Sequence, residues 1–136
     1  MKKLLSIKYS PLAFNLGTLI LRLGLGILMI PEHGYAKLIS FAERKDQFVD
    51  FLGLGSPVSL ALAIFAEFFC SLLLIAGLFT RLAVIPLIIT MLVAFQAHNW
   101  EFFGKYELVP AFLTGYFAIL LLGPGKFSLD AVLNKR

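Results

Sequence analysis

Four long apolar stretches, separated by short polar or glycine-containing segments, dominate this sequence of 136 residues. With a few flanking residues, each reaches the roughly 17–25 residues that a membrane-spanning helix needs. Backbone groups in lipid must find partners within their own segment, and no stretch alternates polar and apolar residues as a barrel strand does. We therefore predict an all-α transmembrane four-helix bundle with up-down topology. It forms one domain over residues 1–136, with helices at about 12–34, 57–78, 82–98 and 107–122.

The composition excludes several classes of protein. Charged residues make up 15% of the chain and hydrophobic residues 60%, whereas about 25% of an ordinary soluble domain is charged. A soluble protein of this size has too much surface to hide so many apolar side chains, so a water-soluble enzyme is excluded. The single cysteine, Cys70, excludes an internal disulfide and a CxxC redox pair. The net charge of +4 is spread along the chain, so we expect no nucleic-acid partner.

The positive charges predict an orientation in the membrane. Lysine and arginine are more frequent at the two termini and in the turn between helices 2 and 3 than in the other two loops, seven against four. The positive-inside rule then places both termini in the cytoplasm. Between helices 1 and 2, residues 38–52 mix apolar and charged side chains. This spacing fits a short amphipathic helix on the membrane surface, or an ordinary polar loop.

Two charged residues fall inside the predicted spans. Arg22 lies ten residues beyond Leu12, and Glu67 lies ten residues beyond Pro57, which is about 15 Å along each helix. Each charge alone would cost on the order of 3 kcal/mol or more at the centre of a bilayer. Since helices 1 and 2 run in opposite directions, we predict that Arg22 and Glu67 form an intramembrane ion pair. Such a pair can tune a cavity, or it can serve only to fix the register of the two helices.

Further polar side chains gather near the predicted outer surface, at the ends of helices 1 and 3 and the start of helix 4. They are Glu32, His33, Lys37, Gln96, His98 and Glu107. We predict that they line one polar cavity, which could hydrogen-bond a carbonyl group, pass protons or hold a polar head group. The alternative is that they are interfacial residues bonded to water. Nothing else supports a haem or a metal ion on the two histidines, so we expect no metal and no intrinsic cofactor.

The ordered set of these motifs resembles the DoxX family of small four-helix bacterial membrane proteins. The resemblance covers about Leu21 to Leu129, and no single motif in it is diagnostic. It rests on Leu21-Arg22 with Gly26, His33-Gly34-Tyr35-Ala36-Lys37, Gly53 to Pro57, Ala66-Glu67, Gly77-Leu78-Phe79-Thr80-Arg81, Met91 to Ala94, His98, Glu107 and Gly123 to Asp130.

The resemblance implies a multi-pass protein of the bacterial inner (plasma) membrane. The family takes its name from a subunit of an archaeal thiosulfate:quinone oxidoreductase, and relatives are linked to resistance against quinones and oxidants. It therefore implies a component of a membrane redox system that acts at a quinone or another lipophilic electron carrier, in contact with partner subunits or a second copy. Whether the chain is itself catalytic stays open. The alternative is a non-enzymatic small-molecule transporter, or a lipid-binding or assembly accessory protein.

Overall fold

The computed structural model describes residues 1–135, and over that range it contains helices and no strands. The first helix is continuous over 29 residues and has three segments: α1 (Pro11–Met29), the π-helical η1 (Ile30–Tyr35) and α2 (Ala36–Ile39). Ser10 starts it, because its hydroxyl accepts a hydrogen bond from the backbone N–H of Ala13. The helix extends past the expected end at residue 34, because Pro31 is accommodated in the wide π-helical turn.

The second helix covers 21 residues and also contains a π-helical segment. Its parts are α4 (Ser56–Ile64), η2 (Phe65–Cys70) and α5 (Ser71–Ala76). It ends at Gly77, whose φ of +71° is the left-handed conformation that glycine adopts without strain. The N–H groups of Gly77 and Leu78 then turn back onto carbonyl groups of α5, which closes the helix end.

The last three helices are α6 (Thr80–Ala97), α7 (Leu108–Leu122) and α8 (Leu129–Leu133). The first turn of α6 is capped from a distance: the Asp130 carboxylate accepts hydrogen bonds from the N–H groups of Phe79 at 2.8 Å and Thr80 at 2.9 Å. A carboxylate is favoured there because a helix N-terminus carries unpaired N–H groups and partial positive charge. Helix α7 ends at Gly123, where φ is +84°.

The connection between the first two helices is mostly irregular. After α2 it contains one short helix, α3 (Phe41–Arg44), and no regular structure follows until Ser56. The amphipathic helix that residues 38–52 could form is therefore reduced to a single turn. Ser40 interrupts it, because its backbone leaves the helical conformation and its hydroxyl bonds back to the carbonyl of Ala36 at 2.6 Å.

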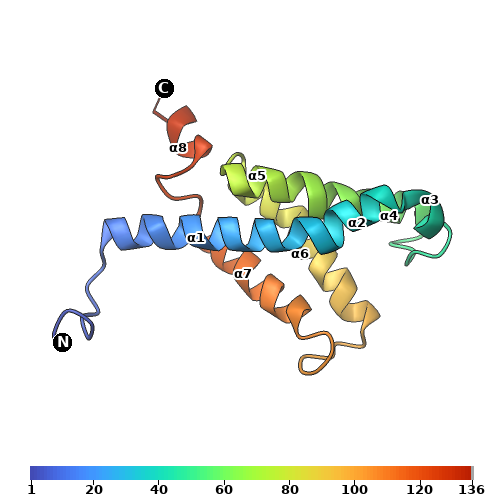
Figure 1. Ribbon diagram of the computed structural model, residues 1–136, viewed down its shortest axis with the longest axis horizontal. Helices are drawn as coiled ribbons and strands as arrows, with labels where there is room; N and C mark the ends of the chain where they lie inside the picture. Colours follow the sequence, from blue (N-terminus) through green and yellow to red (C-terminus); the bar gives the residue numbers. More distant parts are fainter. Residues whose placement is uncertain (136) are drawn as a thin grey trace.

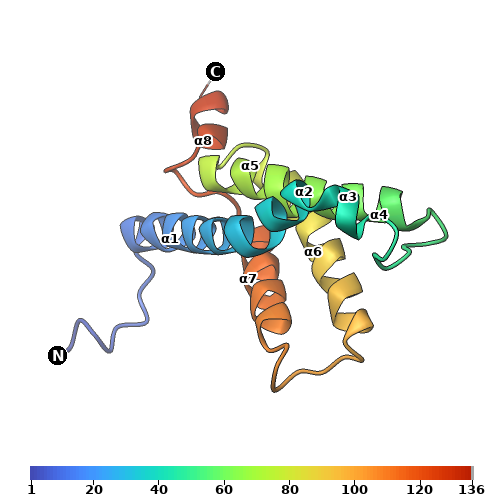
Figure 2. The ribbon, with the colours of Figure 1, turned by 45° about the vertical axis from the view of Figure 1, so that its right-hand side comes forward.

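The helices pack as two pairs. Figure 1 shows α4, η2 and α5 lying along the first helix, and the contacts show that the two run in opposite directions: Gly26 lies against Ile75, and Gly34 against Glu67. Helices α6 and α7 pack on each other and cross this pair (Figures 1 and 2). The apolar core lies where the pairs meet and includes fully buried side chains of each, among them Met29, Leu74, Val84, Leu87, Tyr116 and Ile119.

The outer surface is apolar. Large hydrophobic side chains on all four long helices are exposed, such as Ile20, Phe65, Leu82 and Leu121. Within the described residues, three helices are long and apolar enough to cross a membrane, and the fourth, α7, is apolar but 15 residues long. Exposed apolar faces of this extent are stable in lipid and not in water, so the fold is that of a membrane protein.

Candidate functional site

The two π-helical segments, η1 and η2, lie against each other in the middle of the first helix pair. Wide turns of this kind are rare and occur often at functional sites. Gly34 permits the close approach, because a Cβ atom at this position would lie 2.7 Å from the carbonyl carbon and oxygen of Glu67. Any larger residue would have to push backbone away, so the approach depends on glycine.

A buried ion pair joins η2 to α2, the segment that directly follows η1. The Lys37 Nζ lies 2.5 Å from Glu67 Oε2, and the two side chains are 16% and 3% exposed. Within residues 1–135, Lys37 is the only lysine or arginine whose side-chain nitrogen lies within 4.0 Å of a carboxylate oxygen. Each ion offsets the cost of burying the other, because a lone charge in the bilayer core costs about 3 kcal/mol or more.

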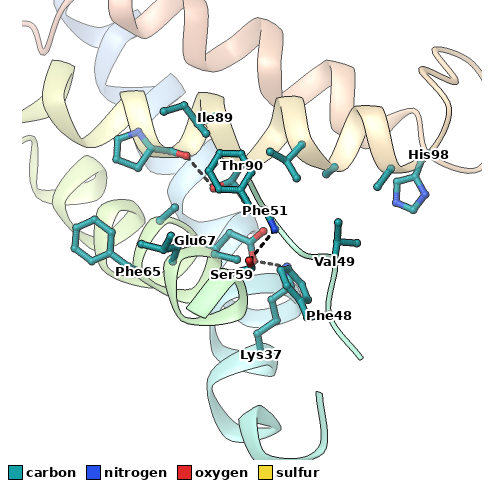
Figure 3. A pocket seen from close by; sticks show the side chains of 17 residues that line it. Lys37, Phe48, Val49, Phe51, Ser59, Phe65, Glu67, Ile89, Thr90 and His98 are labelled. Atoms are coloured by element: carbon teal, nitrogen blue, oxygen red, sulfur yellow. Dashed lines mark hydrogen bonds and ion pairs between the residues drawn. The ribbon is translucent and has the colours of Figure 1, made fainter. Parts of the chain in front are cut away.

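A cavity of about 470 Å³ opens beside the ion pair, between α4–η2 on one side and α6 on the other (Figure 3). We call it the ion-pair cavity. Its charged or titratable lining residues are Lys37, Glu67 and His98, and most of the remaining lining is aromatic or aliphatic, including Phe48, Phe51, Leu62, Phe65 and Ile89. Small-molecule sites typically have this size, about 300–1,000 Å³, and this combination of apolar walls with a few polar groups.

The hydroxyl groups in the cavity wall already have protein partners. The Thr90 hydroxyl donates to the carbonyl of Pro86 at 2.8 Å. The Ser59 hydroxyl donates to the carbonyl of Gly55 at 2.7 Å and accepts from the N–H of Phe51 at 2.8 Å. The ion pair and the histidine are therefore the groups best placed to recognise a polar ligand.

Residues 45–55, which we call the covering loop, close one side of the ion-pair cavity. The loop contributes Phe48, Val49 and Phe51 to the lining. It is held to α4 by hydroxyl groups, because Ser56 donates to the carbonyl of Phe48 at 2.5 Å and Ser59 accepts from Phe51. Figure 3 shows the chain of this loop passing in front of α6, with Val49 between the ion pair and His98.

His98 lines the cavity at the end distant from Lys37 (Figure 3). Its ring is half-buried and stacks on Tyr106, with ring centroids 3.6 Å apart and planes 11° from parallel. Tyr106 lies in the connection between α6 and α7, so stacking fixes the histidine at the point where the helix gives way to that connection. The ring can exchange protons between the cavity and the polar connection.

Arg22 is fully buried, but the predicted ion pair between Arg22 and Glu67 is wrong. Its guanidinium donates to the carbonyl groups of Leu74 at 3.3 Å and Ile75 at 3.4 Å at the C-terminal end of α5, and to the carbonyl of Phe127 at 2.5 Å. Carbonyl groups at a helix C-terminus carry partial negative charge and are good partners for a cation. Arg22 does not line the ion-pair cavity.

The segment that follows α7 completes this arrangement. We call Arg22, the end of α5 that it bonds and residues 123–130 together the arginine clamp. Residues 123–130 lie across the first helix and the turn after α5 (Figure 1): the N–H of Lys126 donates to the Asn15 side chain at 2.9 Å, and Asp130 caps α6. A Cβ atom at Gly77 would collide with the Arg22 guanidinium. The clamp therefore ties α1, α5, α6 and α8 together, and Arg22 in this structure holds helices together through backbone carbonyl groups.

The register of the first two helices explains the error. The prediction counted ten residues from Leu12 and ten from Pro57, and so assumed that the two antiparallel helices have the same length and overlap completely. The residue opposite Glu67 is Gly34, twelve positions beyond Arg22 and about 18 Å further along the helix. Because the first helix continues to Ile39, its last turns reach Glu67 and bring Lys37 to it.

The other predicted cavity residues lie in different places. His33 is half-buried and packs edge-on against Phe112, with ring centroids 6.1 Å apart. Glu32, Gln96 and Glu107 are exposed and do not line the cavity. Of the six, the structure brings Lys37 and His98 to one cavity, together with Glu67, which was expected to pair with Arg22.

Sequence reasoning missed part of the cavity wall. Ser59 and Ala63 precede Glu67 at intervals of four positions, so the three residues share one face of the second helix, and this spacing could have marked the wall. Tyr116 on α7 is fully buried and its hydroxyl has no hydrogen-bond partner within residues 1–135, but this residue does not line the cavity. Among the described residues, no group of three His, Cys, Asp or Glu side chains could hold a metal ion.

Comparison with known proteins adds the family. The sequence matches the DoxX family over residues 17–100, a range that contains Arg22, Lys37, Glu67, His98 and both π-helical segments. No curated protein and no solved structure matches the chain. The matched range covers more than half of the sequence, and the chain belongs to the DoxX family.

Proposed function

We propose that this chain is a component of a bacterial membrane redox system that binds a quinone, or another lipophilic electron carrier, in the ion-pair cavity. The observation that carries the proposal is the Lys37–Glu67 pair, buried within the membrane-spanning helices at the wall of a mostly apolar cavity. Intramembrane charges are expensive, and they usually mark a functional site when they face a cavity.

The cavity suits a ring with polar oxygens and an apolar body. Aromatic side chains from the covering loop, Phe48 and Phe51, and from η2, Phe65, offer faces and edges against which a planar ring can pack. The volume of about 470 Å³ lies within the usual range for small-molecule sites. A water-soluble, strongly charged substrate would leave its charges facing these apolar walls without partners.

The ion pair offers a partner for each form of a quinone. The Lys37 ammonium can donate a hydrogen bond to a quinone carbonyl oxygen, and the Glu67 carboxylate can accept one from a hydroquinone hydroxyl. Reduction adds two electrons and two protons to the quinone. The electrons come from a redox partner subunit, and His98 passes protons between the cavity and the polar connection after α6.

The topology is part of the same proposal. We place both termini in the cytoplasm of a bacterium and let the four long helices cross its inner membrane alternately up and down, as the distribution of lysine and arginine favours. The ion-pair cavity then lies in the outer half of the membrane. A transporter would need a continuous path for its solute across the membrane, and the two intramembrane charges that could line one do not share a cavity, because Arg22 lies apart from Glu67 and the ion-pair cavity.

Quinone binding by the purified protein in lipid nanodiscs tests the proposal. The single tryptophan, Trp100, follows His98 closely and reports binding through quenching of its fluorescence by quinones. We expect a saturable quenching component with ubiquinone and menaquinone analogues, and a loss of affinity of about tenfold or more in Glu67→Gln, which corresponds to roughly 1.4 kcal/mol. The matched control is Thr114→Val, because this exposed residue lies on α7 outside the cavity. Quenching that stays linear in quinone concentration, or that is equal in both variants, would contradict the proposal.

A further inference from the structure

We infer that the ion-pair cavity opens sideways into the lipid, between α4 and α6, and that its ligand is an amphiphile whose apolar tail leaves through this opening. The inference rests on the proposed function for the identity of the head group. It adds that the ligand reaches the site from the bilayer and that the site is built for a molecule with a long prenyl or alkyl chain.

The side wall of the cavity faces lipid. Leu62 and Phe65 on one helix and Ile89 on the other line the cavity, yet they are 46%, 50% and 45% exposed. All three lie within the membrane-spanning helices. A side chain that lines a cavity and is exposed at membrane depth marks the place where the cavity and the bilayer meet.

The arrangement of the helices leaves this opening. Helix α6 packs against α5 and η2 but diverges from α4, as Figure 2 shows. Next to Glu67, the second helix lines the cavity with two small buried residues, Ala63 and Ala66, which leave space between this helix and α6. Pro86 lines the cavity within α6, where its ring removes one backbone hydrogen bond and favours a bend.

The opening is chemically suited to an apolar tail. The hydroxyl groups of Ser59 and Thr90, which line the cavity, are already bonded to backbone carbonyl groups. A hydrocarbon chain therefore meets no polar group that needs a partner until it reaches the ion pair. The covering loop closes another side through Phe48 and Phe51, which favours entry from lipid over entry through the loop.

A blocking substitution at the opening tests the inference. We compare Ile89→Trp with Ile85→Trp, because both isoleucines are exposed on α6, at 45% and 43%, and only Ile89 lines the cavity. The probes are a benzoquinone that carries a decyl chain and the same ring with a methyl group in its place, each at fixed mole fraction in nanodiscs. We expect Ile89→Trp to weaken binding of the decyl compound about tenfold or more and to leave the methyl compound within about twofold, with Ile85→Trp affecting neither.

Equal effects of Ile89→Trp on both probes, or no effect on either, would overturn the inference and leave the proposed function standing. If the wild-type protein binds neither quinone, the proposed function fails, and a photo-crosslinking residue at position 89 or 85 decides the inference separately. We then expect position 89 in native membranes to capture a tailed amphiphile that position 85 does not capture and that is lost in Lys37→Met. The same adducts at both positions, or a crosslink to a second copy of the chain, would overturn it.

Discussion

Replacing Lys37 by methionine separates the electrostatics of the ion pair from its packing. Methionine keeps most of the side-chain volume and removes the charge. Glu67, which is 3% exposed, thereby loses the one ion-pair partner that it has within residues 1–135. Removing one member of a buried pair costs about 3–5 kcal/mol, because the remaining charge stays buried without compensation. We expect Lys37→Met to lose about 3 kcal/mol of unfolding free energy, at the lower end of this range, because Lys37 is 16% exposed and some polar contact can reach the carboxylate.

The double variant Lys37→Met with Glu67→Leu makes the prediction sharper. It removes both charges and leaves apolar side chains of similar size, and such replacements are often neutral or stabilising by about 1–4 kcal/mol. We therefore expect the double variant to regain the stability lost by the single variant. Quinone binding should not return, because neither hydrogen-bonding group is present.

Equilibrium unfolding in mixed detergent micelles, followed by circular dichroism, measures these differences, and Lys45→Met is the matched control. Lys45 is exposed in the covering loop and has no ion-pair partner within the described residues, so its replacement should change stability by less than about 0.5 kcal/mol. A Lys37→Met variant as stable as the wild type would refute the reasoning, because Glu67 would then not depend on this lysine. A double variant as unstable as the single variant would refute it as well.

Three further predictions concern the close contacts and the cap. Gly34→Ala should separate η1 from η2 and lower both stability, measured by unfolding, and quinone affinity, measured by tryptophan quenching. Its control is Gly24→Ala, which has open space around its Cβ position and should be neutral or stabilising by up to about 1 kcal/mol. Gly77→Ala should lower the midpoint of thermal unfolding without changing quinone affinity, because it strains the φ of +71° and displaces the arginine clamp; Gly17→Ala, also in open space, is its control. Asp130→Ala should cost about 1–2 kcal/mol through loss of the α6 cap, and a variant as stable as the wild type would show that the α6 cap is dispensable.

The helices themselves were accessible from the sequence because hydropathy and chain-breaking residues act locally. The apolar runs give the spans, and Gly77 and Gly123, both with positive φ, end two helices near the expected limits at residues 78 and 122. The pairing of charges was not accessible in the same way. It depends on the register between α1 and α4–η2–α5, which is set by close packing at Gly26 and Gly34 and by a loop long enough to permit several alignments.

The candidate site was accessible only in part. Lys37 and His98 stood out as polar residues at helix ends, and the structure brings both to one cavity. The cavity itself depends on the divergence of α6 from α4 and on how the covering loop folds back, and no local pattern encodes either. Arg22 illustrates the converse: its charge suggested a functional role, yet its partners are backbone carbonyl groups that a sequence does not reveal.

The π-helical segments η1 and η2 set the direction in which the residues of the ion pair project relative to the residues of the arginine clamp. Consecutive residues of a helix project about 100° apart, so shortening η2 by one residue would turn everything beyond it by that angle relative to everything before. Either Glu67 or the carbonyl groups that hold Arg22 would then face away from their partners. The number of residues between these two positions is therefore as strict a requirement as their chemistry, and a one-residue deletion in this stretch should be more damaging than most replacements within it.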